Sequence, residues 1–164
     1  MAMEGRKIGL AMDFSKGSKA ALKWAIDGLL RKGDTLFIIH VKHAQGLESR
    51  NLIWSTSGTP LVPLAEFCDP EVMHGYGVQP EPDVLELLEL ISKQLEVTVL
   101  WKIYWGDARE KVCEAIGSLE LDAMIMGSRG LSAIRRVLLG SVTSYVLEHA
   151  TCPVTVVKDR GNEC

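Results

Sequence analysis

The sequence predicts an α/β protein in which one open, parallel sheet is covered by helices on both faces. Short, continuously apolar runs alternate along the chain with longer stretches of helical periodicity. The apolar runs have strand length and no polar face, which is typical of parallel strands buried on both sides. Right-handed connections between successive parallel strands place the helices against the sheet. The order of elements therefore predicts a three-layer, Rossmann-like sandwich.

Length and composition indicate one domain. The chain has 164 residues, of which 47% are hydrophobic and 24% charged, as in ordinary globular proteins. A domain of this size buries enough surface to fold without a metal or a disulfide framework. We expect residues 1–164 to form a single domain.

Five strands are predicted from runs rich in β-branched and large apolar side chains. They cover residues 8–12, 36–41, 97–105, 123–126 and 154–157.

Four helices are predicted between these strands, because apolar residues recur there at spacings of three and four. The first helix ends before Gly33, and the second begins near Pro82. Asp107 is the predicted N-cap of the third helix. The fourth begins at Ser141 and ends before Pro153.

Residues 42–79 depart from this regular pattern. They show no clean period and contain four glycines and three prolines. Loops of this length are usually functional or disordered. Apolar side chains such as Trp54 and Phe67 favour partial packing, so we expect an insertion that lies near the strand ends.

Charge, hydropathy and cysteine spacing exclude several classes of protein. With 18 basic and 21 acidic residues, the net charge of −3 disfavours a nucleic-acid-binding protein. No apolar run approaches the ~20 residues of a membrane helix or forms a signal-peptide core. Cys68, Cys113, Cys152 and Cys164 lie too far apart in the sequence for a recognisable zinc or disulfide pattern. We expect a cytoplasmic or nucleocytoplasmic protein.

A glycine pattern after the fourth predicted strand indicates a phosphate site. Gly127, Gly130, Gly140 and Ser141 follow the spacing G-x2-G-x9-G-[ST]. Glycine allows backbone N–H groups to approach a ligand closely, and the start of a helix attracts phosphate through its unpaired N–H groups and its dipole. This arrangement can hold a polyphosphate.

Several of these residues also have structural interpretations. The glycines could serve only in turns, and Asp13 could cap the first helix, with Ser15 and Ser18 as competitors. Arg129 could contact a phosphate or be a solvated loop charge. His40, inside a strand, is more typical of a hydrogen-bonded core histidine than of a catalyst.

Five motifs in order give the chain a family resemblance. They are a start like V-x-x-D-x-S-x-x-S within residues 8–18, where Asp13, Ser15 and Ser18 match, A-x-x-W-A at 21–25, G-D at 106–107, G-S-R-G at 127–130 and A-x-C-P-V-x-V-V at 150–157. In these motifs the chain resembles the universal stress protein family, in particular its ATP-binding, plant-type branch. The resemblance implies the sheet order 3-2-1-4-5, in which the first and fourth strands are neighbours.

The resemblance also implies an adenine-nucleotide site. The end of the first strand would line the adenine and ribose pocket, the second strand would read the adenine edge, and the fourth strand's loop and the last helix would hold the phosphates. The residues implied are Ala11, Met12, Asp13, Phe14, Ser15, Val41, Met126, Gly127, Ser128, Arg129, Gly130, Gly140, Ser141, Val142 and Thr143. Asp13 could instead help to hold Mg²⁺ on the phosphates.

The expected function is therefore binding of ATP or AMP, with Mg²⁺ alongside ATP, in a regulatory stress response. The chain lacks a P-loop, a nucleophile elbow and an H-E-x-x-H motif, so we expect at most slow ATP hydrolysis. The alternative is a nucleotide-independent module of the same fold, either chaperone-like or redox-responsive through Cys68 or Cys164. The resemblance further implies a homodimer that pairs the last strand, between Pro153 and Lys158.

Overall fold

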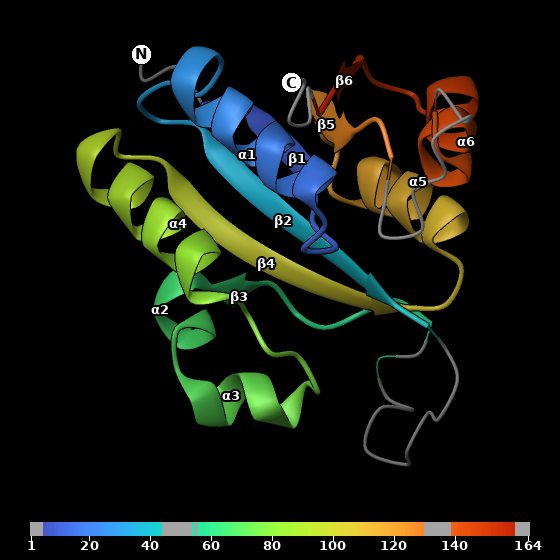
Figure 1. Ribbon diagram of the computed structural model, residues 1–164. Coiled ribbons are helices and arrows are strands. Elements are labelled where there is room, and N and C mark those ends of the chain that lie inside the picture. Colours follow the sequence, from blue (N-terminus) through green and yellow to red (C-terminus); the bar gives the residue numbers. More distant parts are fainter. Residues whose placement is uncertain (1–4, 44–53, 55, 130–138, 160–164) are drawn as a thin grey trace, which may run out of the picture.

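The described residues form one six-stranded sheet with helices on both faces (Figure 1). The computed structural model describes residues 5–43, 54, 56–129 and 139–159. The strands are β1 (Lys7–Ala11), β2 (Thr35–Lys42), β3 (Val62–Pro63), β4 (Thr98–Trp105), β5 (Ala123–Gly127) and β6 (Val154–Val157). The helices are α1 (Lys16–Gly28), α2 (Leu64–Phe67), α3 (Pro70–Gly75), α4 (Pro82–Gln94), α5 (Ala108–Ser118) and α6 (Ser141–His149).

The strand order is β3-β4-β2-β1-β5-β6. The five predicted strands are present, all pair in parallel, and their order 3-2-1-4-5 is confirmed. The prediction of five strands was incomplete, because β3 pairs antiparallel with β4 at one edge. A strand of two residues, Val62 and Pro63, is too short to show a period of two in the sequence.

Alternate residues of the central strands face two separate hydrophobic layers. Leu36 and Ile38 of β2 pack toward α1 and α4, while Phe37 and Ile39 pack toward α5 and α6. A strand buried on both faces must be apolar at every position, so the continuous apolar runs in the sequence reflect this layering.

Side chains cap three of the helices at their first turn. Ser15 accepts a hydrogen bond from the N–H of Ser18 at the start of α1, and Asp69 accepts one from the N–H of Glu71 at the start of α3. Asp107 is the N-cap of α5, as predicted. The fourth predicted helix, α6, begins after Gly140, which provides no side-chain cap.

The described part of the insertion packs against β4 and α4. Phe67 is fully buried and stacks on Trp101 of β4, with ring centroids 3.5 Å apart. Met73 of α3 is also buried. These contacts fix α2 and α3 beside the sheet edge that β3 forms.

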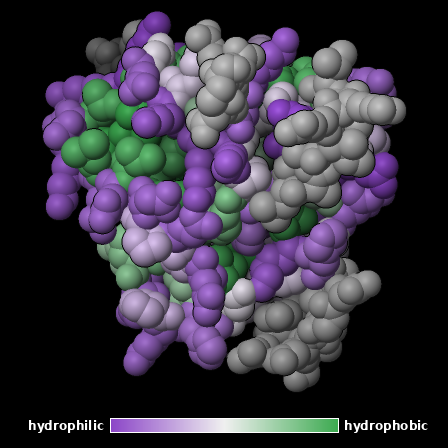
Figure 2. Space-filling view, in the orientation of Figure 1, coloured by the Kyte–Doolittle hydropathy of each residue, from purple (hydrophilic) through white to green (hydrophobic). Residues whose placement is uncertain are grey.

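Helix α4 leaves part of its apolar surface uncovered. Leu90 is 45% exposed, and Figure 2 shows apolar side chains gathered on the side of the molecule where α4 lies. Within the described ranges, no helix combines the length and the hydropathy needed to cross a bilayer.

Candidate functional site

Strands β1, β2 and β5 bring the predicted site residues together at their carboxyl ends, which form one edge of the sheet. β1 lies between β2 and β5, with Ala11 opposite Ile39 and Leu10 opposite Ile125. All three strands are parallel, so their carboxyl ends and the loops that follow lie together. Ligands of open α/β sheets bind at such an edge.

The loop from β1 to α1 is shaped by short-range hydrogen bonds. One carboxylate oxygen of Asp13 accepts a hydrogen bond from the N–H of Ser15 at 2.9 Å. Ser15 in turn caps α1, so the cap is neither Asp13 nor Ser18. The structure gives the second carboxylate oxygen of Asp13 no partner among the described residues, which leaves it available to a ligand or to a cation that a ligand carries.

Phe14 holds this loop in an unusual conformation. Its φ of 62° lies in the left-handed region, which is costly for a residue with a side chain. Its ring packs against His40, at 5.3 Å between centroids, and is stacked on Trp101 at 6.3 Å. These aromatic contacts compensate for the backbone strain and fix the direction in which the loop leaves the sheet.

His40 supports the same loop from β2. Its Nδ1 lies 2.8 Å from the carbonyl oxygen of Met12, which can only accept, so Nδ1 carries the proton. Burial lowers the pKa of His40 below its usual value, which favours the neutral imidazole. The interpretation of His40 as a hydrogen-bonded core histidine agrees with this geometry.

The exit of β5 lies in close contact with the first turn of α1. A Cβ placed on Gly127 would lie 2.6 Å from the carbonyl carbon of Gly17, and one placed on Gly17 would lie 2.5 Å from the carbonyl oxygen of Arg129. Only residues without a side chain allow the two segments to approach this closely. Gly127 and Gly17 therefore determine how near α1 lies to the candidate phosphate loop.

The start of α6 is attached to the same loop. The Gly140 N–H donates to the Ser128 carbonyl oxygen at 2.7 Å, and the Thr143 hydroxyl donates to the Gly127 carbonyl oxygen at 2.9 Å. The first N–H groups of a helix have no intrahelical partners. Unlike α1, α3 and α5, helix α6 has no side-chain cap among the described residues, so its first N–H groups can bind an anion.

The predicted site residues differ in how far their side chains are exposed. Five side chains are buried, so they can present only their backbone to a ligand or support the site from below: Met12, Ser15, Met126, Ser128 and Thr143. Eight are partly or fully exposed, or are glycines at the edge itself: Ala11, Asp13, Phe14, Val41, Gly127, Arg129, Gly140 and Val142. Ser141 is exposed at the first position of α6. Gly130 lies outside the described residues.

Sequence reasoning missed one residue that shapes this edge and found the role of a second only in part. Gly17 was not singled out, although a glycine within a helical pattern is itself a signal of close packing. His40 was assigned to the core without its contact to the Met12 carbonyl. Neither contact could be found from spacing alone, because each joins segments far apart in the chain.

The described residues include neither a cluster of metal-binding side chains nor a reactive thiol at Cys68. No group of three or more His, Cys, Asp or Glu side chains there could hold a metal ion. Burial, followed by the nearby carboxylate of Glu89, raises the pKa of Cys68 to about 11. A thiol with this pKa is protonated near neutral pH and reacts slowly, which disfavours Cys68 as a redox sensor. Cys164 lies outside the described residues.

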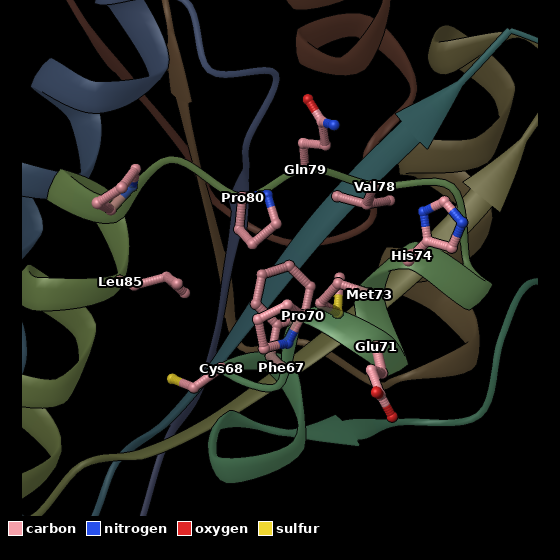
Figure 3. Close-up of a pocket in the computed structure, with 11 residues that line it drawn as sticks. Phe67, Cys68, Pro70, Glu71, Met73, His74, Val78, Gln79, Pro80 and Leu85 are labelled. Atoms are coloured by element: carbon pink, nitrogen blue, oxygen red, sulfur yellow. The ribbon is translucent and has the colours of Figure 1, made fainter.

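A pocket of about 650 Å³ lies elsewhere, beside α3 and the start of α4 (Figure 3). It shares no residue with the predicted nucleotide site. The glycine pattern and this pocket therefore indicate two different places on the molecule.

Comparison with known proteins identifies the family. The universal stress protein family matches residues 5–158. Universal stress protein PHOS34 of Arabidopsis thaliana is 34% identical over 93% of this chain, and PHOS32 of the same plant is 32% identical over 93%. The chain belongs to the universal stress protein family. It spans 62% of the length of PHOS34 and 64% of that of PHOS32.

Solved structures share the fold. Protein MJ0577, a universal stress protein of Methanocaldococcus jannaschii, is 25% identical with a TM-score of 0.65, covering 98% of this chain and 100% of its own. An Arabidopsis thaliana family member solved with AMP bound is 20% identical with a TM-score of 0.57, covering 96% of this chain and 94% of its own. These similarities establish the Rossmann-like arrangement that the sequence predicts.

Proposed function

We propose that this protein binds an adenine nucleotide, ATP or AMP, at the edge where β1, β2 and β5 end, and that it acts as a regulatory stress protein. The uncapped first turn of α6, attached to Gly127 and Ser128, carries the proposal, because it presents backbone N–H groups beside a glycine-lined strand end. Two solved family members, one with AMP and one with cAMP, add support at the level of the family.

The residues present suit such a ligand. The close approach of Gly17 and Gly127 holds the start of α1 against the end of β5, and the Asp13 carboxylate has one oxygen without a partner among the described residues. With ATP, Mg²⁺ would neutralise phosphate charge, and the Asp13 carboxylate is the group of this chain that would assist. A cytoplasmic or nuclear location remains our expectation.

ATP is expected to raise the melting temperature of the protein. A ligand present at ~100 times its Kd that binds only the folded state adds about 2.7 kcal/mol, or roughly 5–10 °C for a domain of this size. Differential scanning fluorimetry with ATP, ADP and AMP, each with Mg²⁺, measures the shift. The absence of a shift with all three at millimolar concentration would contradict the proposal.

A pair of variants at Ser141 tests the location of the site. Ser141→Asp places a carboxylate at the first position of α6, where the helix dipole favours it, so the fold is retained while a phosphate is repelled. We expect at least a roughly tenfold loss of ATP affinity. Ser141→Asn is the neutral control of similar size and should bind ATP much as the parent does. Equal affinities of the two variants would show that the α6 start does not hold the phosphates.

We also propose a homodimer formed through β6. This strand is at the edge of the sheet, its four residues Val154–Val157 are all partly exposed, and an apolar edge strand normally needs a partner. Multi-angle light scattering should give twice the chain mass, and Val156→Pro, which removes a backbone N–H that faces away from β5, should shift the mass toward the monomer. A monomeric parent protein at micromolar concentration would refute the dimer.

A further inference from the structure

The pocket of about 650 Å³ is built by the insertion and the start of α4 (Figure 3). Phe67 and Met73 lie buried beneath it, and Val78, Pro80 and Leu85 also line it. Its volume lies in the range of pockets that hold small organic molecules, and its lining is mainly apolar, as in such pockets.

The side chains beneath the pocket are firmly supported. Phe67 has no exposed surface and stacks on Trp101, which belongs to the central sheet and is itself fully buried. Met73 and Val78 are 1% and 4% exposed, and the Val78 N–H donates to the Met73 carbonyl oxygen at 3.0 Å. The cavity is therefore a pre-formed feature of the fold, and binding does not require the core to rearrange.

The electrostatic character of the surrounding segment is strongly negative. Residues 64–89 contain seven Asp and Glu residues and no Lys or Arg. Two lysines from outside the segment reach it: Lys19 pairs with Glu81 and Asp83, and Lys42 donates to the Gly77 carbonyl oxygen. These contacts leave most of the negative charge of the segment uncompensated.

Of the acidic residues in this segment, Glu71 is the one that lines the pocket. Its carboxylate forms no ion pair with any described residue, whereas its backbone N–H is bound by Asp69. In Figure 3, Glu71 and His74 lie at one end of the pocket, and Cys68 and Leu85 lie at the other. Glu89 adds a second carboxylate, 3.2 Å from the Cys68 thiol.

We infer that this pocket binds a small amphipathic cation, a molecule with an apolar body and an ammonium group. The apolar body fills the space over Phe67 and Met73, and the ammonium group lies beside the Glu71 carboxylate. A neutral molecule of the same shape gains the apolar contacts without the charge attraction, and an anion is repelled. The site is separate from the nucleotide edge and does not depend on the function proposed there.

The test uses three probes that share one tail and differ in charge: n-octylammonium, 1-octanol and octanoate. Each is titrated at pH 7.5 and low salt into ¹⁵N-labelled protein, and backbone amide shifts are followed by NMR. We expect saturable shifts at Phe67, Met73, Val78 and Leu85. Affinity should fall from octylammonium to octanol by about three- to fivefold, as for an exposed ion pair, and fall again for octanoate.

A variant at Glu71 separates charge from shape. Glu71 is exposed, so Glu71→Gln should retain the fold, reduce the preference for octylammonium and bind octanol as before. Glu148→Gln, which removes an exposed carboxylate from α6 on the other face of the sheet, is the matched control and should keep the preference. The inference is overturned if octylammonium gives no saturable shifts at these amides, if octanoate binds equally well, or if the two variants behave alike.

Discussion

Replacing Gly127 with alanine is expected to lower the free energy of unfolding by about 2–3 kcal/mol, the range of an overpacked core position. The new Cβ would lie 2.6 Å from the carbonyl carbon and 2.8 Å from the carbonyl oxygen of Gly17. Both are backbone atoms that cannot rotate away, so α1 must shift from the end of β5. Urea denaturation of the two proteins measures the loss.

Gly28→Ala is the control for this prediction. Gly28 is the last residue of α1, and a Cβ there would meet nothing within 4 Å. Alanine at this position should leave stability unchanged or raise it by up to about 1 kcal/mol, because alanine favours the helix. A loss below ~0.5 kcal/mol for Gly127→Ala would show that the strand end tolerates a side chain and that glycine is not required there for packing. If the two segments also shape the nucleotide site, the same variant should bind ATP less tightly.

The sequence predicts the sheet well because its signals are local. Each parallel strand is an apolar run, and Asp107 marks the start of its helix through a side chain that caps it. The glycine pattern likewise predicts the α6 start, since Gly140 precedes the first helical residue. The order of the strands came from the family resemblance, because no local signal specifies which strands are neighbours.

The features that could not be predicted depend on contacts between distant segments. The requirement for glycine at position 17 arises from Arg129, more than a hundred residues away. The positive φ of Phe14 depends on His40 and Trp101 in two other strands. The pocket of the insertion depends on Phe67 stacking over the sheet, although the acidic composition around it is evident in the sequence.

A second large effect is expected at the amino ends of the central strands, on the side of the sheet away from the candidate nucleotide site. There Arg6 and Asp34 form a two-point ion pair. The Arg6 Nε lies 3.1 Å from one carboxylate oxygen and its Nη2 lies 2.6 Å from the other, and the Arg31 N–H also donates to the carboxylate at 2.8 Å. The Asp34 side chain is only 3% exposed. Nη2 also donates to the Leu29 carbonyl oxygen, so the pair joins the starts of β1 and β2 to the end of α1.

Asp34→Asn should lower the free energy of unfolding by about 2–3 kcal/mol at pH 7, because it leaves the Arg6 charge facing a neutral amide whose NH₂ group cannot accept a hydrogen bond. The matched control is Asp107→Asn. Asp107 and Arg109 form a similar two-point pair, but their side chains are 38% and 49% exposed, and asparagine can still cap α5. The loss at Asp107 should therefore be much smaller. ATP affinity should be unchanged in both variants, since neither pair touches the candidate nucleotide site.

The effect at Asp34 should also depend on pH in a defined direction. Burial by itself would raise the pKa of Asp34, but the hydrogen bonds from Arg6 and Arg31 and the Arg6 charge hold it below its ordinary value of about 3.9. A carboxylate with a lowered pKa contributes its full stability above the unfolded pKa and loses it as the pH falls through the folded pKa. The difference between the parent and Asp34→Asn should thus stay constant from pH 7 down to about pH 4 and shrink below it. A difference that is equally large at pH 3 and pH 7 would mean that packing, rather than the charge of Asp34, holds the two strands to α1.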